Sequence, residues 1–262
     1  MSSYDTISVD RDGNVGRIAF DRPDAHNSLN ERMGEELCEA GHELVSDDEI
    51  RCLVLTGNGA TFNTGADLTI LDGSGVDEPL LRRLTNLLHE FVSQLVRAPK
   101  PVVSGINGVV AGGGIGPGIC ADVVLVAESA RFEFAYPRIG LSADGGSTYL
   151  LPRLVGLRRA QELAFRDEPV GAAEAVELGL ATEVVSDDEF SARLDEEAER
   201  LAAGPTKAHA ATKRLLVESF DNSMDTQLAN EAERIAELTN TADFERGHAA
   251  FGSDDEPTFE GH

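Results

Sequence analysis

Apolar and polar residues alternate in two segments near the N-terminus, Tyr4 to Val9 and Val15 to Phe20. Successive side chains of a β-strand point to opposite faces, so this spacing is typical of strands with one buried face. Asp12, Gly13 and Asn14 lie between the two segments and favour a tight turn. The chain is therefore predicted to open with a β-hairpin.

After the hairpin, amphipathic helices alternate with short apolar runs. Apolar residues recur every three or four positions in two segments, Leu29 to Val45 and Pro79 to Val96, which predicts helices. The short apolar runs, which we interpret as buried strands, are Cys52 to Leu55, Pro101 to Ile106 and Val123 to Ala127. Apolar strands that alternate with helices are typical of an α/β fold with a mainly parallel sheet.

The end of the chain has a different pattern. After Asp188 only helices are expected, and Gly204 followed by Pro205 is typical of one helix ending and the next beginning. The expected helices are Phe190 to Ala203, Pro205 to Phe220, Met224 to Leu238 and Ala242 to Phe251. We therefore divide the chain into an α/β core, residues 1–190, and a C-terminal helical region, residues 191–262.

The length of 262 residues is enough to bury a substantial apolar core. No run of eighteen or more apolar residues occurs, and the N-terminus lacks the basic start and apolar run of a signal peptide. These features predict a soluble cytoplasmic protein.

The composition is strongly acidic, with 22 Lys and Arg against 47 Asp and Glu and a formal net charge of −25 at pH 7. The only lysines are Lys100, Lys207 and Lys213. Self-repulsion at this charge opposes a compact fold in dilute buffer, whereas near 1 M salt the Debye length falls to about 3 Å. The imbalance therefore indicates adaptation to a salty cytoplasm. It also argues against nucleic acid or an anionic membrane as a partner, because both require a basic surface.

Cysteine and histidine give no sign of a disulfide or a metal site. Cys38, Cys52 and Cys120 are odd in number and lie in apolar or helical contexts, so we expect buried, reduced thiols. The histidines are scattered without metal-ligand spacing, and no metal site is predicted. Ser142 and Ser147 have no histidine at plausible local spacing for a nucleophilic triad.

Two glycine-bearing loops, residues 62–68 and 107–116, follow predicted strands, and the second contains Gly112, Gly113 and Gly114 ahead of a helix. Consecutive glycines let the main chain approach a ligand closely. The first N–H groups of a helix, with the helix dipole behind them, are also oriented toward negative charge. A tight turn packed against a sheet would explain the glycines equally well. Main-chain N–H groups are thus candidate binding groups, with a structural turn as the alternative.

The two loops, in this order and at this separation, resemble the enoyl-CoA hydratase/isomerase (crotonase) superfamily, and the resemblance covers nearly the whole chain. The segments that carry it are Arg22-Pro23, Asn27-Ser28-Leu29, Leu53 to Gly57, Gly65 to Leu68, the glycine cluster, Cys120-Ala121-Asp122, Ser129 to Phe132, Gly140-Leu141, Leu151 to Gly156 and Ala172 to Leu180.

This resemblance implies a spiral α/β core of ββα units, with the C-terminal helices forming a trimerisation region in a homotrimer or homohexamer. It also implies that the N–H groups of Ala66 and Gly113 form an oxyanion hole for the oxygen of a coenzyme A thioester. Implied substrate-binding residues are Ala66, Asp67, Leu68, Thr69, Gly112 and Gly113. No cofactor is implied, since coenzyme A enters as part of the substrate.

Hydratases of the superfamily use two glutamates to hold and activate water, and this chain has neither. The matching positions are Gly116 and Arg138. General base catalysis requires a base within hydrogen-bond reach of the proton, so the usual hydration geometry is missing. The loop from Leu141 to Tyr149 instead resembles that of 1,2-epoxyphenylacetyl-CoA isomerases and Δ3,Δ2-enoyl-CoA isomerases. That resemblance implies that Asp144 is the catalytic carboxylate which shuttles the proton.

Several alternatives stay open at this point. Asp144 would also suit the N-cap of a helix from Gly145 to Leu151, a position that Asp often fills. The chain could be an isomerase, a hydratase that uses unexpected residues, or a noncatalytic acyl-CoA-binding protein. The coenzyme A phosphates also lack an evident partner, because Ser253, Asp254, Asp255 and Glu256 stand where the superfamily usually has basic residues. The candidate substitutes are Arg22, Arg138 and Arg246.

Overall fold

The structure, a computed structural model, describes residues 4–252 and 256–262. It opens with the predicted β-hairpin, in which β1 (Ile7–Asp12) pairs antiparallel with β2 (Val15–Phe20). β1 begins three residues later than the alternation suggested. Gly13 adopts a φ of 53° in the two-residue turn, a left-handed conformation that glycine allows without steric cost.

The first sheet of the core has six strands in the order β1-β2-β3-β5-β7-β10 among the described residues. All strand pairs after the hairpin are parallel. The strands that follow the hairpin are β3 (Cys52–Gly57), β5 (Val102–Ile106), β7 (Val123–Ala127) and β10 (Glu183–Val185). The three buried apolar runs were therefore predicted correctly, and the parallel α/β fold is confirmed.

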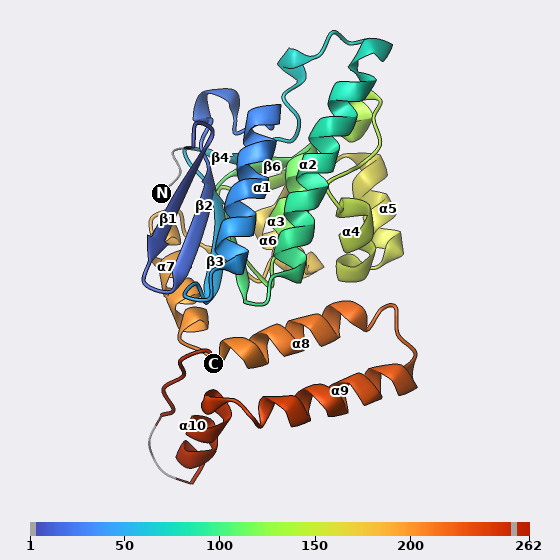
Figure 1. The fold of residues 1–262 in the computed structure, drawn as a ribbon. Coiled ribbons are helices and arrows are strands. Elements are labelled where there is room, and N and C mark those ends of the chain that lie inside the picture. The colour runs from blue at the N-terminus through green and yellow to red at the C-terminus, as the bar shows by residue number, and fades with distance from the viewer. Residues whose placement is uncertain (1–3, 253–255) are drawn as a thin grey trace.

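A second sheet, with the order β4-β6-β8-β9, was not predicted by the pattern of apolar residues. Its strands are β4 (Thr61–Asn63), β6 (Val109–Ala111), β8 (Arg131–Glu133) and β9 (Val170–Gly171). After β3, β5 and β7, the chain enters the second sheet as β4, β6 and β8 and then continues into helical structure. This repetition is the expected spiral of ββα units (Figure 1).

Helices cover the two sheets and supply much of the core. α1 packs against α2, and α7 packs against four strands of the first sheet. The largest fully buried side chains include Phe20, Phe62, Phe91, Phe132 and Phe134. The helices of this part are α1 (Glu31–Ser46), α2 (Glu78–Arg97), α3 (Ile115–Ile119), α4 (Ser147–Val155), α5 (Leu157–Arg166), α6 (Ala172–Leu178) and α7 (Phe190–Ala202).

The last three helices extend away from the core. α8 (Thr206–Glu218) and α9 (Met224–Leu238) lie side by side, and α10 (Ala242–Ala250) follows (Figure 1). The buried Lys213 joins α8 to the core, because its ammonium group donates to Asp122 and to the carbonyl oxygen of Leu95. The helices of the C-terminal region were predicted almost to the residue. Their division from the core near residue 190 stays a prediction, and by packing α7 belongs with the first sheet.

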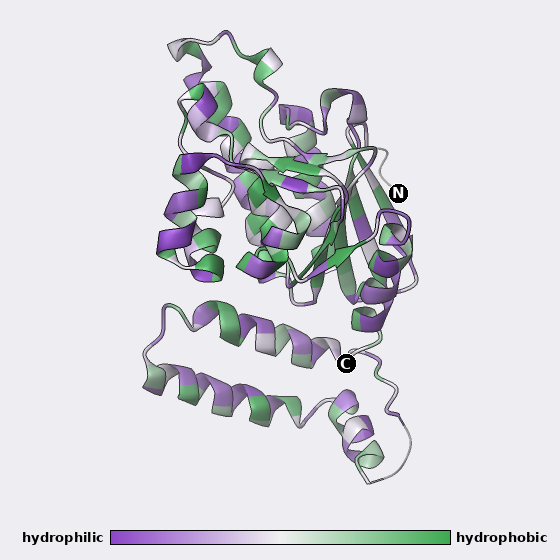
Figure 2. Cartoon of the chain, turned by 180° about the vertical axis from the view of Figure 1, so that it is seen from behind, coloured by the Kyte–Doolittle hydropathy of each residue, from purple (hydrophilic) through white to green (hydrophobic). Residues whose placement is uncertain are grey.

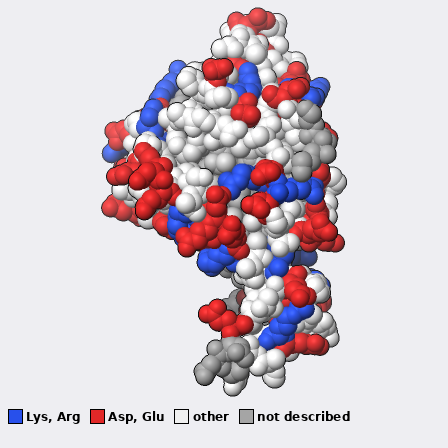
Figure 3. All heavy atoms as spheres, turned by 90° about the vertical axis from the view of Figure 1, so that its left-hand side faces the viewer, with Lys and Arg blue, Asp and Glu red and all other residues white. Residues whose placement is uncertain are grey.

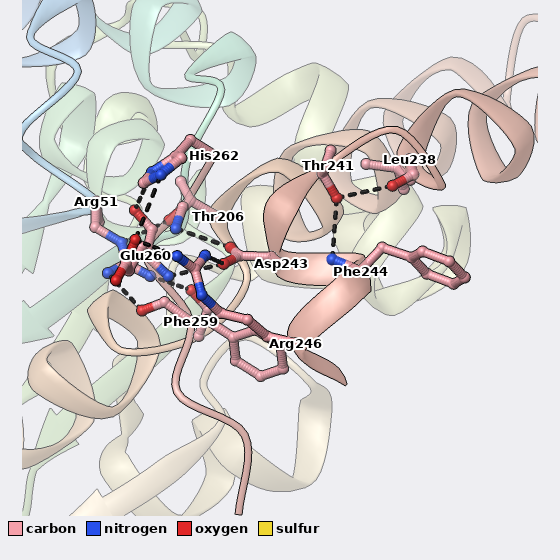
Figure 4. A network of polar contacts seen from close by, with 12 residues as sticks. Arg51, Thr206, Leu238, Thr241, Asp243, Phe244, Arg246, Phe259, Glu260 and His262 are labelled. Atoms are coloured by element: carbon pink, nitrogen blue, oxygen red, sulfur yellow. Dashed lines mark hydrogen bonds and ion pairs between the residues drawn. The ribbon is translucent and has the colours of Figure 1, made fainter. Parts of the chain in front are cut away.

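The C-terminal segment folds back and connects α10 with the core (Figure 4). Asp243 accepts hydrogen bonds from the N–H groups of Glu260 and Gly261, both at 2.8 Å. Arg51, just before β3, donates to the carbonyl oxygen of Phe259 at 3.1 Å and to Thr206 Oγ1 at 3.0 Å. A polar network thus ties the end of the chain to both α10 and the first sheet.

Polar and apolar surfaces are distributed unevenly. The strands of the core are mostly hydrophobic, whereas α8 and α9 alternate between hydrophobic and hydrophilic residues along their length (Figure 2). Acidic side chains are spread over the surface with arginine between them, as Figure 3 shows for one face. Within the described ranges, no helix has the length and apolar character needed to cross a membrane.

Candidate active site

Three loops meet because the strands that precede them are neighbours in the second sheet. β4, β6 and β8 run parallel in that order. Carboxyl ends of adjacent parallel strands lie along one edge of a sheet, where ligands commonly bind in α/β proteins. The loop after β4 carries Ala66, the segment after β6 carries Gly113, and the loop after β8 leads to Asp144. The topology therefore brings the three sequence-predicted residues to one edge.

Ala66 is held with its N–H group directed away from Leu29, its partner in an isolated parallel bridge. Leu29 N–H donates to Gly65 O at 2.7 Å, and Asp67 N–H donates to Leu29 O at 2.9 Å. In this parallel bridge the groups of Gly65 and Asp67 bond to Leu29, so the N–H of Ala66 points to the opposite side. Within the described part of the chain that N–H has no recorded acceptor.

The loop after β4 packs directly against the glycine cluster. Gly65 has a φ of 78°, and a Cβ at this position would lie 2.6 Å from Gly113 N. Asn63 supports the turn, since its side-chain oxygen accepts the N–H of Gly65 at 2.8 Å. Gly113 lies in the first turn of the short helical segment Gly112–Gly114, where N–H groups have no intrahelical acceptor. Two main-chain donors are thus brought close together.

Asp144 lies beside Gly113 and is held by two hydroxyl groups. Tyr136 donates to Asp144 Oδ1 at 2.7 Å, and Thr85 of α2 donates to Oδ2 at 3.2 Å. A Cβ added to Gly113 would lie 3.2 Å from Asp144 Oδ1, so the carboxylate faces the glycine cluster. The alternative that Asp144 caps a helix is wrong. α4 begins only at Ser147, and no side chain caps it.

Tyr136 is well suited to hold the carboxylate. It is buried, and burial, together with the negative charge of Asp144, raises the pKa of its hydroxyl above the usual tyrosine range. The hydroxyl therefore keeps its proton and donates it to Oδ1. The hydroxyl oxygen of Tyr136 in turn accepts the N–H of Asp144 at 3.2 Å. Tyr136 thus fixes both the side chain and the main chain of Asp144.

Gly116 and Gly145 are too close to permit a side chain at position 116. A Cβ on Gly116 would lie 1.7 Å from the carbonyl oxygen of Gly145, which no real contact allows. Gly145 itself has a φ of 62°, and a Cβ there would lie 2.8 Å from Gly113 O. The loop that carries Asp144 therefore occupies the space that a carboxylate side chain at position 116 would need.

Arg138, the second position without a glutamate, points toward other charges. Its guanidinium group pairs with Glu133 at 2.7 Å and with Asp167 at 2.5 Å, and its side chain is 45% exposed. These two partners hold the pKa of Arg138 above its usual value through hydrogen bonds and charge. This residue supplies no base to the site.

A pocket of about 340 Å³ connects these groups. One face of α2 forms its apolar wall, with Leu81, Leu84 and Leu88 at helical spacing. Asp144 is the only acidic residue among the described residues that line it. The full lining is Leu29, Thr64, Ala66, Leu68, Leu81, Leu84, Thr85, Leu88, Gly112, Gly113, Ala135, Tyr136, Arg138, Ile139, Leu141, Ser142 and Asp144.

The other predicted substrate-binding residues are divided between the pocket and the loop interior. Leu68 lines the pocket and is 45% exposed. The side chain of Asp67 instead accepts from the N–H and the hydroxyl of Thr69, at 3.1 and 2.6 Å. Burial alone would raise the pKa of Asp67, but hydrogen bonds from Thr69 and Arg22 outweigh it and lower the pKa. These two side chains stabilise the loop that carries Ala66.

The candidate phosphate-binding arginines all have acidic partners. Arg22 pairs with Asp67 at 3.0 Å, Arg138 with two acids, and Arg246 with Asp243 at 3.1 Å. Ser253, Asp254 and Asp255, the acidic stretch noted in the sequence, lie outside the described residues. Each of these arginines would have to exchange a carboxylate for a phosphate in order to bind coenzyme A.

The cysteines offer no nucleophile. All three are free, and burial raises the pKa of the Cys52 and Cys120 thiols to about 12. Thiols with such pKa values carry almost no thiolate at neutral pH. Over the part of the chain that the structure covers, no group of three or more His, Cys, Asp or Glu side chains is arranged to hold a metal ion.

Sequence reasoning missed the residues that support the site. Thr85, His89 and Tyr136 all lie outside the glycine loops in the sequence. The fold brings Thr85 and Tyr136 to Asp144 and brings His89 to the next residue, Gly145. The pairing of Asn63 with Gly65 is local, and an asparagine two residues before a glycine is a turn signal that could have been recognised.

Known proteins resemble this chain over nearly its whole length. A family model described as enoyl-CoA hydratase/isomerase matches residues 10–262. A protein of Rhodobacter capsulatus named "probable enoyl-CoA hydratase" is 40% identical over 263 residues, 99% of each chain. The 1,2-epoxyphenylacetyl-CoA isomerase of Escherichia coli is 35% identical over 249 residues, 94% of this chain and 95% of its own length. The crystal structure of an enoyl-CoA hydratase from Bacillus anthracis is 29% identical with a TM-score of 0.92, and the match covers 98% of this chain and all of that one.

Proposed function

This chain belongs to the enoyl-CoA hydratase/isomerase family, and on that premise we propose that it is an isomerase that moves a double bond within the acyl group of a coenzyme A thioester. The observation that carries the proposal is the pairing of a single carboxylate, Asp144, with the two main-chain donors at Ala66 and Gly113.

In the proposed reaction, the thioester oxygen accepts hydrogen bonds from the N–H groups of Ala66 and Gly113. Asp144 removes a proton from C2 of a 3-enoyl thioester, and negative charge develops on the thioester oxygen of the resulting dienolate. The donors stabilise that charge, and removing one such donor typically costs about 3 kcal/mol. Asp144 then returns its proton to C4, so the double bond ends between C2 and C3. One carboxylate suffices because it leaves the reaction in its starting form.

Hydration, the main alternative, requires a water molecule that is held and deprotonated while a proton is delivered to carbon. The name of one relative, probable enoyl-CoA hydratase, supports this alternative. Against it stand the exclusion of any side chain at position 116 and the pairing of Arg138 with two acids. Because Asp144 is the only acid among the described lining residues, the pocket offers one proton-transfer group rather than two.

The acyl group falls into two proposed classes, an aliphatic enoyl chain or a ring-opened product of an aromatic epoxide. The second class is suggested by the 35% sequence identity to the 1,2-epoxyphenylacetyl-CoA isomerase. The apolar wall of α2 would contact either group. We further propose a homotrimer or homohexamer, since apolar side chains such as Phe220 and Ile235 of the C-terminal region are 60% and 71% exposed in the single chain.

Incubation with 3-enoyl-CoA and, separately, with 2-enoyl-CoA tests the proposal. We expect conversion of the first and no addition of water to the second. The variant Asp144→Asn should lose about 10²- to 10⁴-fold in kcat, the usual contribution of a general acid–base group, while a saturated acyl-CoA binds with unchanged Kd. Hydration of 2-enoyl-CoA would favour the alternative, and tight binding with neither reaction would identify a noncatalytic acyl-CoA-binding protein.

A further inference from the structure

His89 of α2 contacts the loop that carries Asp144 at its next residue. The N–H group of Gly145 donates a hydrogen bond to His89 Nε2 at 3.1 Å. Gly145 is buried, whereas His89 lies at the surface between two hollows beside the pocket. A surface imidazole is therefore the recorded acceptor for a buried main-chain donor next to the carboxylate.

This hydrogen bond restrains the peptide that joins Asp144 to Gly145. Two consecutive N–H groups of the loop are now held by side chains, that of Asp144 by the Tyr136 hydroxyl at 3.2 Å and that of Gly145 by His89. Gly145 also packs closely against Gly113, since a Cβ on Gly145 would lie 2.8 Å from the carbonyl oxygen of Gly113. Rotation of this peptide would turn the Asp144 side chain away from the glycine cluster.

We propose that His89 is a positioning residue, which holds Asp144 in the site through Gly145 N–H and does so only as the neutral imidazole. An imidazole nitrogen accepts a hydrogen bond only when it carries no proton. Protonation of Nε2 would place two donors opposite each other and break the contact. The loop would then lose one of its two main-chain restraints.

The charged groups around His89 line the two hollows on either side of it. The hollow on one side is lined by Asp77, Glu78 and Arg82, from the start of α2 and the loop before it. The hollow on the other side is lined by Arg97 at the end of α2, together with Asp144 and Tyr149. Three acids and two arginines thus set the electrostatic environment of the imidazole.

The activity test rests on the proposed function and uses two variants and a control. His89→Leu removes the acceptor, and we expect kcat for 3-enoyl-CoA to fall about 10- to 100-fold, as for a small displacement of a reacting group, with KM within about twofold. His89→Gln restores an uncharged acceptor and should keep most of kcat. His42→Leu, an exposed histidine of α1, serves as the control and should match the unchanged protein.

The pH profile separates positioning from a general structural role. In the unchanged protein, kcat should decline when acid protonates the imidazole, because the acceptor for Gly145 N–H is then lost. In His89→Gln this part of the decline should disappear. Full activity of His89→Leu, or equal loss in the Leu and Gln variants, would refute the proposal.

A measurement without substrate keeps the inference independent of the isomerase assignment. In protein labelled with ¹⁵N-glycine, the amide resonance of Gly145 should shift with pH in the unchanged chain and stay constant in His89→Gln. A Gly145 resonance that does not change with pH in the unchanged protein would refute the proposed contact even if isomerisation is observed. A pH-dependent resonance without any isomerisation would instead retain the contact and reject the proposed function.

Discussion

The loops around Asp144 and the C-terminal helices are held in place by different means. Around the site, main chain lies directly on main chain, and glycines at positions 65, 113, 116 and 145 make that approach feasible. α9, by contrast, has no buried residue, and α10 buries only Asp243 among those described. Close main-chain contacts therefore fix the geometry of the site within one chain. α9 and α10 are held instead by a few polar contacts, and apolar side chains on α9 remain exposed.

The polar contacts that join α10 and the end of the chain to the core centre on Asp243 and Arg51 (Figure 4). Met224, Leu228 and Ile235 on α9 are 77%, 51% and 71% exposed. Because these apolar side chains are exposed, the α8–α9 pair adds little to the stability of a single chain. This exposure is consistent with the proposed contact between subunits. Changes in the loops around Asp144 should therefore act on catalysis, and changes in the C-terminal helices should act on local stability.

Apart from changes to Asp144 itself, the largest effect is expected from Gly116→Ala. The new Cβ would overlap the carbonyl oxygen of Gly145, which is main chain and moves only with the whole loop. We expect kcat to fall about 100-fold, because an error of about 1 Å in a reacting group has that effect, and the free energy of unfolding to fall by about 1–3 kcal/mol. Steady-state kinetics and urea unfolding measure the two quantities.

Gly118→Ala on the same helix is the matched control, since its Cβ would meet only side chains, the nearest at 3.3 Å. A normal kcat in Gly116→Ala would show that the loop adjusts freely and would remove the contrast between the two regions.

Tyr136→Phe should have the next largest effect. It removes the donor to Asp144 Oδ1 but keeps the buried ring. A hydrogen bond to a charged group contributes at least about 1.5 kcal/mol, so kcat should fall at least about 10-fold. Tyr149→Phe is the control, because that ring lies under Arg153 and is 43% exposed. Equal kcat values for the two variants would contradict the role given to Tyr136.

A smaller and local effect is expected from Asp243→Ala. The variant leaves the N–H groups of Glu260 and Gly261 without their acceptor. Amide hydrogen exchange in α10 and residues 256–262 should quicken about 10-fold, which corresponds to roughly 1.4 kcal/mol, while exchange in β3 and β5 stays unchanged. Asp225→Ala, an exposed acid of α9, is the control. Faster exchange throughout the core would mean that the two regions unfold together.

The smallest effect per residue is expected from salt, which changes thermal stability through the net charge of −25. Screening by KCl should raise Tm by about 2–4 °C for each kcal/mol of repulsion that is relieved. Thermal unfolding followed by circular dichroism between low and molar KCl measures the rise. A Tm that does not change with salt would contradict the predicted adaptation to a salty cytoplasm.

The fold was predictable wherever a segment was long enough to show a period. The strand at Val123–Ala127 and helix α9 were predicted to the residue. The second sheet was not, because β4, β6 and β8 have three residues each, too few to display alternation. Because the pattern did not predict the second sheet, it also gave no physical reason for the three site loops to converge.

The site was predicted only in part. Ala66, Gly113 and Asp144 followed from the resemblance, and the structure places them around one pocket. The interpretation of Asp144 as a helix cap arose because its spacing from the helix was misjudged, and two glycines separate it from α4. Thr85 and His89 reach Asp144 and Gly145 from positions 59 and 56 residues away, and no local pattern encodes such contacts.

The approach of Gly116 to the carbonyl oxygen of Gly145 also constrains how this lineage can change its chemistry. A substitution that introduces an acid at position 116 is harmful by itself, because the loop with Asp144 already fills the space. Only a prior shortening or displacement of that loop would make the substitution tolerable. The two changes are therefore strongly epistatic, and a library that mutates position 116 alone should yield no gain of water addition.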